Sequence, residues 1–365
     1  MARVLPIGLD IGTTTVRMLQ LAGSEDDVRL VDAAKYVVPQ EAKRDPSGLR
    51  EAVVEGIRGI LRGRRFRRRE AVMALKADEL AVRSMRMAKM PEEELPTAVN
   101  WEVQNKFPFD TATAVVQYLR AGEVRHGDQV LDEIIVFVAP RAAVESKIEL
   151  ACDMGLDVVS LDAEPCAVFR GFERFLHRRE DESVVTALVD IGSRTTVVIA
   201  RGRDIIFVKT IPIGGAVFNR SVADCLELAP SEAEALRRRL ARRSEEADPA
   251  DPVCRAVTDC IRPPLEDLAN EIGLCLRYYA VTFRGPRPES ITFSGGEAHD
   301  PTIPRMLGER LGMEVTIGDP FRRIRTNHLG AIPDRRQCAS EWATSLGLSL
   351  KGFALAGVAE AASAA

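Results

Sequence analysis

The chain has 365 residues, of which 46% are hydrophobic and 28% are charged, and its formal net charge is −4. This composition is typical of a soluble globular protein with a full-sized core, in one large or two ordinary domains. The weak negative charge argues against a protein that attracts nucleic acid through its overall field. No uncharged stretch approaches the length of a bilayer span and no basic-then-apolar signal stands at the start, so we expect membrane contact to be indirect or peripheral.

The first informative segment is Pro6–Val16, which contains the tripeptide Asp10-Ile-Gly12. Its aliphatic and β-branched flanks predict two buried strands joined by a tight turn. Gly12 can take a positive φ and lets a ligand approach the backbone. The hydroxyls that follow this glycine, together with the N–H groups of the turn, form a nest for phosphate oxygens; they belong to Thr13, Thr14 and Thr15. Asp10 is placed to hold a water molecule on Mg²⁺.

A helix is predicted over Ser47–Arg62, and residues 80 to about 155 have the pattern of an inserted module. Its order is strand, helix, strand, strand, helix, and glycine in a left-handed conformation is expected to end the last helix. The predicted elements are Val82–Met87, Glu92–Phe107, Ala114–Ala121, Glu133–Ala139 and Arg141–Met154, with Gly155 as the terminator.

A second copy of the first motif stands half a chain later, in Ala187–Val198, where Asp190-Ile-Gly192 is followed by Ser193. We expect the same strand, turn and strand, in which Gly192 can take a positive φ and Asp190 is placed to hold a water molecule on Mg²⁺. One such turn is a weak signal because Asp-x-Gly turns are common in hairpins. Two copies in matching strand contexts, about one domain apart, indicate a duplicated fold with a nucleotide between its halves.

The second half continues with a strand over Ile205–Ile211, followed by Gly214 and Gly215. These two glycines form either a simple loop break or a turn close to the phosphates, and we favour the turn. Residues 216–285 are strongly helical, with a break within 237–251. A helix is expected over Glu341–Leu350, and the Ala-rich tail after it is expected to fray.

The seven cysteines are scattered and form no CxxC pair. An odd number without a repeating spacing favours reduced thiols used as small buried residues. This indicates a cytoplasmic protein.

The two turns resemble the first and second phosphate motifs of the actin, Hsp70 and sugar-kinase superfamily. Three further segments stand in the order that this superfamily requires. Asp162–Ala167 resembles its first connecting motif, Phe293–Gly296 resembles its adenosine motif, and Leu346–Leu348 resembles its second connecting motif.

Within that superfamily the chain is similar to the PilM family of actin-like proteins in type IV pilus assembly. The segments that carry this resemblance are Gly8–Arg17, Ala151–Glu164, Thr210–Gly215, Ala233–Arg237 and Asp319–Phe321. The resemblance implies an α/β, actin-like (ribonuclease H-like) two-lobed ATPase fold, with an inserted β-α-β-β-α subdomain of the type shared by PilM and the division protein FtsA.

The resemblance also implies a division into four parts. The first-lobe core comprises residues 1–78, 156–180 and 341–365, and the inserted subdomain comprises residues 79–155. The second-lobe core comprises residues 181–215 and 286–340, and residues 216–285 form its outer helical subdomain.

ATP and Mg²⁺ are the cofactors that the resemblance implies, with Gly295 and Gly296 against the adenosine. Glu234 and Arg237 would contact the nucleotide, although residues three apart on a helix also form ordinary surface pairs. Glu164 would orient a hydrolytic water, yet an acid before proline also suits the start of a helix. Turnover would at most be slow.

The implied partner is the cytoplasmic N-terminal tail of a PilN-like inner-membrane protein, docked near residues 80–155. The protein would then be cytoplasmic and peripheral at the inner membrane through that partner, with a possible homo-oligomer. Two alternatives share the fold: a small-molecule kinase, for which we find no convincing catalytic Asp, and an FtsA-like structural or division protein, which requires an amphipathic C-terminal anchor.

Departures from the family pattern keep a third alternative open, a fold that has lost its nucleotide. Arg237 stands where the family has Lys, which preserves the charge but changes the hydrogen-bonding geometry. Arg194 places a bulky cation in the second phosphate turn.

Overall fold

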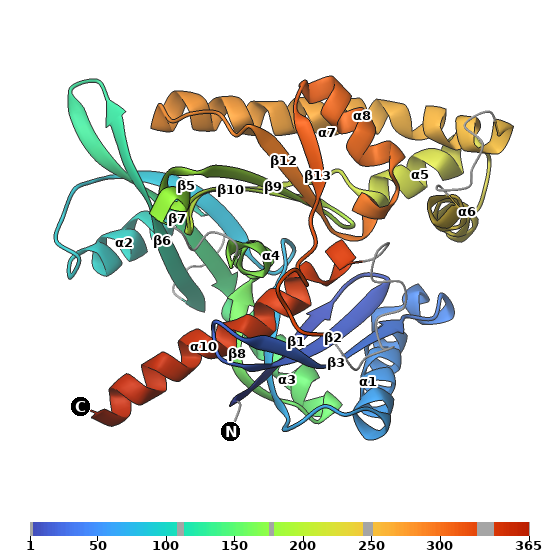
Figure 1. Cartoon of the computed structure of the whole chain (residues 1–365), viewed down its shortest axis with the longest axis horizontal. Coiled ribbons are helices and arrows are strands. Elements are labelled where there is room, and N and C mark those ends of the chain that lie inside the picture. The colour runs from blue at the N-terminus through green and yellow to red at the C-terminus, as the bar shows by residue number, and fades with distance from the viewer. Residues whose placement is uncertain (1–2, 108–112, 175–178, 244–250, 327–338, 365) are drawn as a thin grey trace.

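The computed structural model describes residues 3–107, 113–174, 179–243, 251–326 and 339–364. Two five-stranded sheets, one in each half of the chain, are joined by helices, and a three-stranded sheet lies beside them. Figure 1 shows the N-terminal sheet and the C-terminal helix in one lobe and the second sheet with long helices in the other.

The first-lobe sheet has the order β3-β2-β1-β4-β8. Its first three strands are antiparallel, and β4 and β8 continue the sheet in parallel. The strands are β1 (Arg3–Ile11), β2 (Thr15–Gly23), β3 (Val28–Val37), β4 (Glu70–Leu75) and β8 (Asp157–Ala163). Most residues of β1 and β2 are buried, which agrees with the continuous apolar pattern of strands that are covered on both faces.

The second-lobe sheet repeats this topology with the order β11-β10-β9-β12-β13. Again three antiparallel strands are followed by two parallel ones. The strands are β9 (Val185–Ile191), β10 (Thr195–Arg201), β11 (Asp204–Ile211), β12 (Ser290–Ser294) and β13 (Glu314–Ile317). The repeat expected from the two Asp-Ile-Gly segments is therefore a repeat of whole sheets.

Helices cover the faces of the first-lobe sheet. Helices α1 (Pro46–Gly63) and α3 (Arg141–Met154) share an apolar core with β1 and β4, and α10 (Ala343–Ala364) packs on β1 and on α4 (Glu164–Glu173). Two glycines allow close contact here. A Cβ on Gly8 would lie 1.8 Å from the carbonyl oxygen of Ser345, and one on Gly347 would lie 1.7 Å from that of Ala167.

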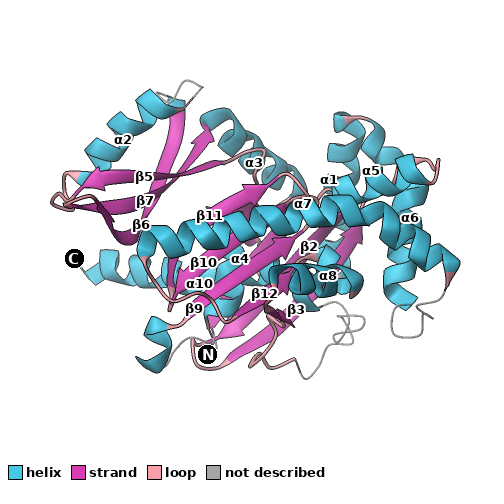
Figure 2. Cartoon of the chain, turned by 90° about the horizontal axis from the view of Figure 1, so that it is seen from above, coloured by secondary structure: helices cyan, strands magenta, loops and turns pink. Residues whose placement is uncertain are grey.

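The insert contains β5 (Ala81–Ala88), α2 (Leu95–Lys106), β6 (Ala114–His126) and β7 (Gln129–Pro140), with the sheet order β5-β7-β6. Together with α3, ended by Gly155 in the left-handed conformation, this is the predicted order of elements. Its sheet shares a core with the second lobe, in which Ile135 and Phe137 belong to the same cluster as Phe207 of β11. Figure 2 shows the insert sheet beside β11, near one end of α7 (Pro252–Phe283).

The outer part of the second lobe is helical. Helices α5 (Gly215–Cys225), α6 (Pro230–Arg243), α7 and α8 (Thr302–Leu311) surround its sheet. Short 3₁₀ segments complete the described elements: η1 (Glu41–Arg44), η3 (Arg179–Ser183), η4 (Gly296–His299) and η5 (Ala339–Trp342). The expected break falls between α6 and α7, with residues 244–250 outside the described ones.

Two expectations about this half are wrong. The tail from Ala354 onward is helical to Ala364, because it continues α10. Cys225 of α5 and Cys260 of α7 form a disulfide, so they are not the free thiols expected from their spacing. Sequence spacing cannot reveal this pairing because it depends on how two helices pack. Among the described residues, no helix is both long enough and apolar enough to cross a membrane.

Candidate functional site

The two Asp-Ile-Gly segments form matching turns, each between the first and second strand of its sheet. The N–H of Gly12 donates to the carbonyl of Thr15 at 2.9 Å, and the N–H of Gly192 donates to that of Arg194 at the same distance. Neither glycine adopts the positive φ that glycine permits. Gly12 is needed for space, since a Cβ there would lie 2.8 Å from the carbonyl oxygen of Thr15, whereas Gly192 has room for one.

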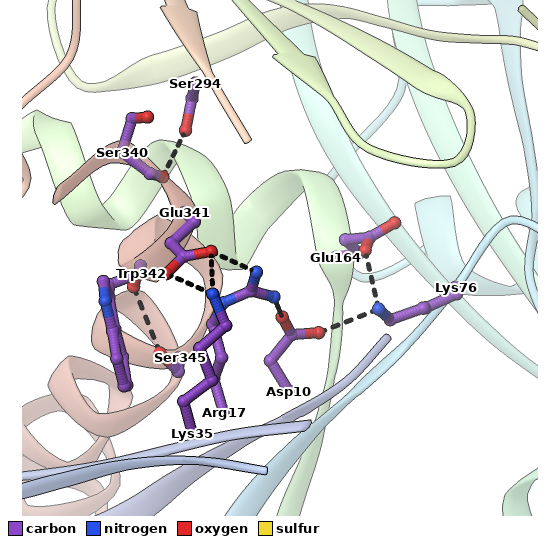
Figure 3. Close-up of polar contacts among 10 residues, drawn as sticks. All are labelled: Asp10, Arg17, Lys35, Lys76, Glu164, Ser294, Ser340, Glu341, Trp342 and Ser345. Carbon is purple, nitrogen blue, oxygen red and sulfur yellow. Dashed lines mark hydrogen bonds and ion pairs between the residues drawn. The ribbon is translucent and has the colours of Figure 1, made fainter. Parts of the chain in front are cut away.

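Asp10 ends its buried strand between two cations, as Figure 3 shows. Its Oδ1 lies 2.8 Å from Nζ of Lys76, and its Oδ2 lies 3.6 Å from Nη1 of Arg17. Burial would raise the pKa of Asp10, but Lys76 and Arg17 hold it below its ordinary value. Asp10 is therefore ionised at neutral pH.

Glu164 faces the other side of the same ammonium. Its Oε1 lies 3.4 Å from Nζ of Lys76, and it is the first residue of α4, followed by Pro165. Burial raises the pKa of Glu164 although Lys76 opposes the shift. Burial would lower the pKa of Lys76, but the two carboxylates raise it, so the lysine stays charged. The expected start of a helix at Glu164 is present, and the carboxylate also belongs to a charged cluster.

Asp190 is the acidic residue that the second lobe contributes. Burial, followed by the carboxylate of Glu164, raises the pKa of Asp190 to about 7, while a hydrogen bond from Ser294 works against the shift. Asp10 raises this pKa further. The carboxylates of the two lobes are thus close enough to disfavour one another's charge.

A second ion cluster ties this site to the entrance of α10. Nη2 of Arg17 and Nζ of Lys35 lie 2.6 and 2.8 Å from Oε2 of Glu341. Burial would raise the pKa of Glu341, but Arg17 and Lys35 lower it to about 2. The preceding residue, Ser340, accepts hydrogen bonds at its carbonyl from the Ser294 hydroxyl and from the N–H of Gly295. This segment therefore contacts the first lobe through residue 341 and the second through residue 340.

The double glycine starts α5 beside the second turn. A Cβ on Gly214 would lie 2.8 Å from the carbonyl oxygen of Gly192, and the N–H of Gly215 donates to that oxygen at 2.8 Å. Gly295, with φ of +90°, leaves no room for a side chain, since a Cβ would lie 2.4 Å from the carbonyl of Ile191. The glycine-rich segments thus converge on the end of β9, and Gly296, which starts η4, is open to solvent on its Cβ side.

Glu234 and Arg237 do not pair with each other. Arg237 is buried, donating to Oδ1 of Asn219 at 2.7 Å and to Oε2 of Glu297 at 2.5 Å. Glu234 pairs with Arg238 at 2.7 Å and lies 3.8 Å from Nζ of Lys43, a first-lobe residue. The simple surface pair considered from their spacing is therefore absent, and Glu234 instead connects the lobes.

Sequence reasoning missed four charged members of this site: Arg17, Lys76, Glu297 and Glu341. The sequence did contain a signal for Lys76. This residue directly follows β4, which pairs in parallel with β1, and it therefore lies at the same edge of the sheet as Asp10. None existed for the pair of Arg17 and Glu341, which are 324 residues apart. Arg194, the cation expected to crowd the second turn, is exposed.

A comparison with family models decides where this chain belongs. The model described as type IV pilus assembly protein PilM matches residues 8–353. The chain belongs to the PilM family. The predicted family is thereby confirmed.

Solved structures agree with this assignment. A chain of the structure described as a PilM–PilN type IV pilus biogenesis complex is 25% identical, with a TM-score of 0.78 over 96% of this chain and 99% of its own length. The ethanolamine utilization protein EutJ from Carboxydothermus hydrogenoformans matches with a TM-score of 0.54 and 16% identity, over 95% and 89% of the two chains. MreB5 of Spiroplasma citri bound to ADP matches with a TM-score of 0.52 and 11% identity, over 98% of each chain. The predicted actin-like fold is confirmed.

Proposed function

We propose that this PilM-family protein binds ATP with Mg²⁺ between its two Asp-Ile-Gly turns. The bound nucleotide would control the affinity of the protein for the cytoplasmic N-terminal tail of a PilN-like inner-membrane protein. One observation carries the nucleotide part: carboxylates and glycine turns from both lobes converge on a single charged cluster. The PilN part is supported by the similarity to a chain from a PilM–PilN complex.

The turns fit the phosphates of a nucleotide. The N–H groups of Thr13 and Thr14 in one turn, and of Ser193 and Arg194 in the other, donate to no acceptor in the described part of the chain. Free backbone donors in a concave turn form an anion nest. Gly12 and Gly214 keep these turns free of side chains, since a Cβ at either position would lie 2.8 Å from a carbonyl oxygen of a turn. The hydroxyls of Thr13, Thr14, Thr15 and Ser193 would supplement the nest.

The charges fit Mg²⁺. Two carboxylates, those of Asp10 and Glu164, pair with the ammonium of Lys76. Burial, and after it the negative charge of Glu164, raises the pKa of Asp190. Mg²⁺ binds through few carboxylates and keeps most of its waters. Asp10 and Asp190 would hold it through water, and the metal would neutralise phosphate charge. Glu164 would orient the attacking water, and Lys76 would hold that carboxylate in place, for a turnover that is at most slow.

The adenosine would lie against Gly295 and Gly296, with Glu234 at its edge. Arg237 belongs to the same contact region, where its hydrogen bond to Glu297 holds that carboxylate beside Gly215 and a second hydrogen bond goes to Asn219. The pairing of Glu234 with Lys43 would then place an adenosine contact on a bridge between the lobes.

The four-part division of the chain given above is part of this proposal, with the partner tail docked near residues 80–155. Through that tail the protein would lie in the cytoplasm at the inner membrane, and assembly into homo-oligomers is compatible with this role. The membrane would be reached only through the partner.

Isothermal titration of the full chain tests both parts. We expect Mg²⁺-AMPPNP to bind the wild type and to lose at least tenfold in affinity in Gly214→Val, whose side chain would collide with the second turn. Gly59→Val is the matched control, because a Cβ there meets nothing within 4 Å. A synthetic peptide of the PilN-like tail should bind with an affinity that depends on the nucleotide. Absence of binding by both ligands would overturn the proposal.

A further inference from the structure

A hollow of about 550 Å³ opens on the second lobe, away from the site described above. Its walls are residues 269–277 in the second half of α7, residues 287–289 before β12, and the segment that leads from α8 into β13. It therefore lies where β12 and β13 begin. The phosphate turn Gly192 and the adenosine turn Gly295 lie where the parallel strands β9 and β12 end. Figure 1 shows α7 and α8 on the side of this sheet that faces away from the first lobe.

Three arginines from three different segments line this hollow: Arg277, Arg287 and Arg310. In the part of the chain that the structure describes, none of their side chains forms an ion pair or a hydrogen bond. Glu289 is the acidic residue of the lining, so the lining carries a net charge of +2, three positive charges minus one negative. This contrasts with a net charge of −4 for the whole chain.

Two other exposed arginines of the same helices have acidic partners, whereas Arg255 of α7 forms no ion pair within the described residues. Arg262 of α7 lies 3.1 Å from Asp259, and Arg305 of α8 lies 3.5 Å from Glu309. Like charges that line one hollow repel one another, and the single carboxylate of Glu289 leaves two of the three positive charges uncompensated. The three arginines of the hollow are therefore arranged as a receptor for an anion.

The floor between these arginines is apolar, formed by Ala269, Leu276, Leu311 and Met313. Gly273 lies in the interior of α7 and adds space to the hollow. Glycine at such a position weakens a helix relative to alanine. No tight packing requires this glycine, because a Cβ there would meet its nearest neighbours, Arg277 and Leu311, at an ordinary 3.7 and 3.8 Å. Its effect is to leave space above the floor.

We propose that this hollow binds a small organic phosphate, meaning a phosphate monoester with an apolar or aromatic body. A phosphate ester carries about −1.5 to −2 charges at neutral pH, which balances the charge of the lining. Guanidinium groups bind phosphate oxygens in pairs, and the apolar floor would take the body of the ligand. The volume lies within the range of about 300–1,000 Å³ that is usual for small-molecule sites. This inference does not depend on nucleotide binding at the turns.

Isothermal titration with phenyl phosphate, inorganic phosphate and benzoate tests the inference. We expect phenyl phosphate to bind more tightly than either fragment, because it alone combines the charge with the apolar body. Binding should weaken at least tenfold in the double variant Arg277→Gln/Arg310→Gln, because two positive charges are lost. It should weaken at least tenfold in Gly273→Leu as well, because the new side chain fills the hollow. Arg262→Gln/Arg305→Gln, on the same helices, is the matched control and should bind as the wild type does.

Hydrogen exchange identifies the site, with phenyl phosphate expected to protect residues 269–277 and 305–313. Three results would overturn the inference: no binding of phenyl phosphate at millimolar concentration, equal effects of the hollow and control variants, or loss of binding in Gly214→Val alone. The last result would assign the phosphate to the turns between the lobes.

Discussion

The side chain of Asp190 has two carboxylates and one ammonium as its main charged neighbours. Because its pKa is raised to about 7, the folded state holds a proton between pH 4 and pH 7 that the unfolded state has released. The free energy of unfolding attributable to this residue therefore falls as pH rises through that window. We expect Asp190→Asn to remove roughly 2 kcal/mol or more of this pH dependence, since one pKa unit corresponds to about 1.4 kcal/mol.

Urea unfolding of both proteins at pH 5 and pH 8 measures this difference. If Mg²⁺ binds as proposed, Mg²⁺-AMPPNP should reduce the pH dependence of the wild type in the same way, because the metal stabilises the ionised carboxylate. An unchanged pH dependence in Asp190→Asn would show that the proton is held elsewhere.

Glu341 is the opposite case, a buried carboxylate with two cations beside it. Its pKa is lowered to about 2, so its stabilising effect is complete above pH 5 and is lost as pH falls toward 2.

Glu341→Gln leaves Arg17 without this partner and should cost about 3–5 kcal/mol at pH 7, the usual range for breaking a buried pair. Chemical unfolding of this variant, of Arg17→Met and of the double variant should show strong non-additivity. Glu51→Gln on the exposed face of α1 should have little effect, and additive single effects would contradict the pairing.

At the scale of elements, α10 crosses α4 and β1 at glycines that permit near backbone contact. A Cβ at 347 would overlap the carbonyl of Ala167, so Gly347→Ala should force the helices apart and destabilise the fold by about 1–3 kcal/mol or more. Gly357→Ala in the same helix is the control, because a Cβ there meets nothing within 4 Å. It should leave stability unchanged or raise it by up to about 1 kcal/mol, since alanine favours the helix. Thermal unfolding of both variants compares them, and equal effects would argue against the proposed crossing.

The individual helices and strands were predicted from the sequence better than the contacts between them. The apolar runs around Asp10 and Asp190 specified both hairpins, and the period of Arg141–Met154 together with Gly155 specified α3 and its end. Contacts between distant elements were not predictable, because a local pattern shows that a face is buried but not what buries it. The ion pair of Arg17 with Glu341 and the disulfide of Cys225 with Cys260 are examples.

At the scale of the whole molecule, the insert belongs to the first lobe by sequence but packs on the second. Ile135 and Phe137 share a core with Phe207, and the Tyr278 hydroxyl of α7 donates to the buried Oε1 of Glu133 at 2.9 Å. Oε2 of the same carboxylate accepts a hydrogen bond from Nε of Arg86 at 3.2 Å. The insert sheet is therefore fixed to the second lobe through an apolar core and a buried hydrogen-bonded acid.

The same apolar cluster also includes Leu75 of β4 and Phe169 of α4 in the first lobe, and two chain connections join the insert to that lobe. The chain enters the insert through residues 76–80 and leaves it through α3, which packs on α1 and β8. A movement of one lobe against the other would leave the core between insert and second lobe intact and would bend these two connections. Nucleotide binding between the lobes would in this way change how the insert lies on the first lobe, which gives the proposed control over a partner tail a physical route.

Distances between spin labels, attached through genetically incorporated amino acids, test this coupling. We place labels at Val130 of the insert, Val281 of the second lobe and Arg58 of the first lobe, all exposed. Upon addition of Mg²⁺-AMPPNP, the distance from Val130 to Val281 should stay constant while that from Val130 to Arg58 changes. Tyr278→Phe removes one of the hydrogen bonds to Glu133 and should broaden the first distance distribution. A constant distance from insert to first lobe, with a changing distance to the second, would mean that the insert moves with the lobe into which it is inserted.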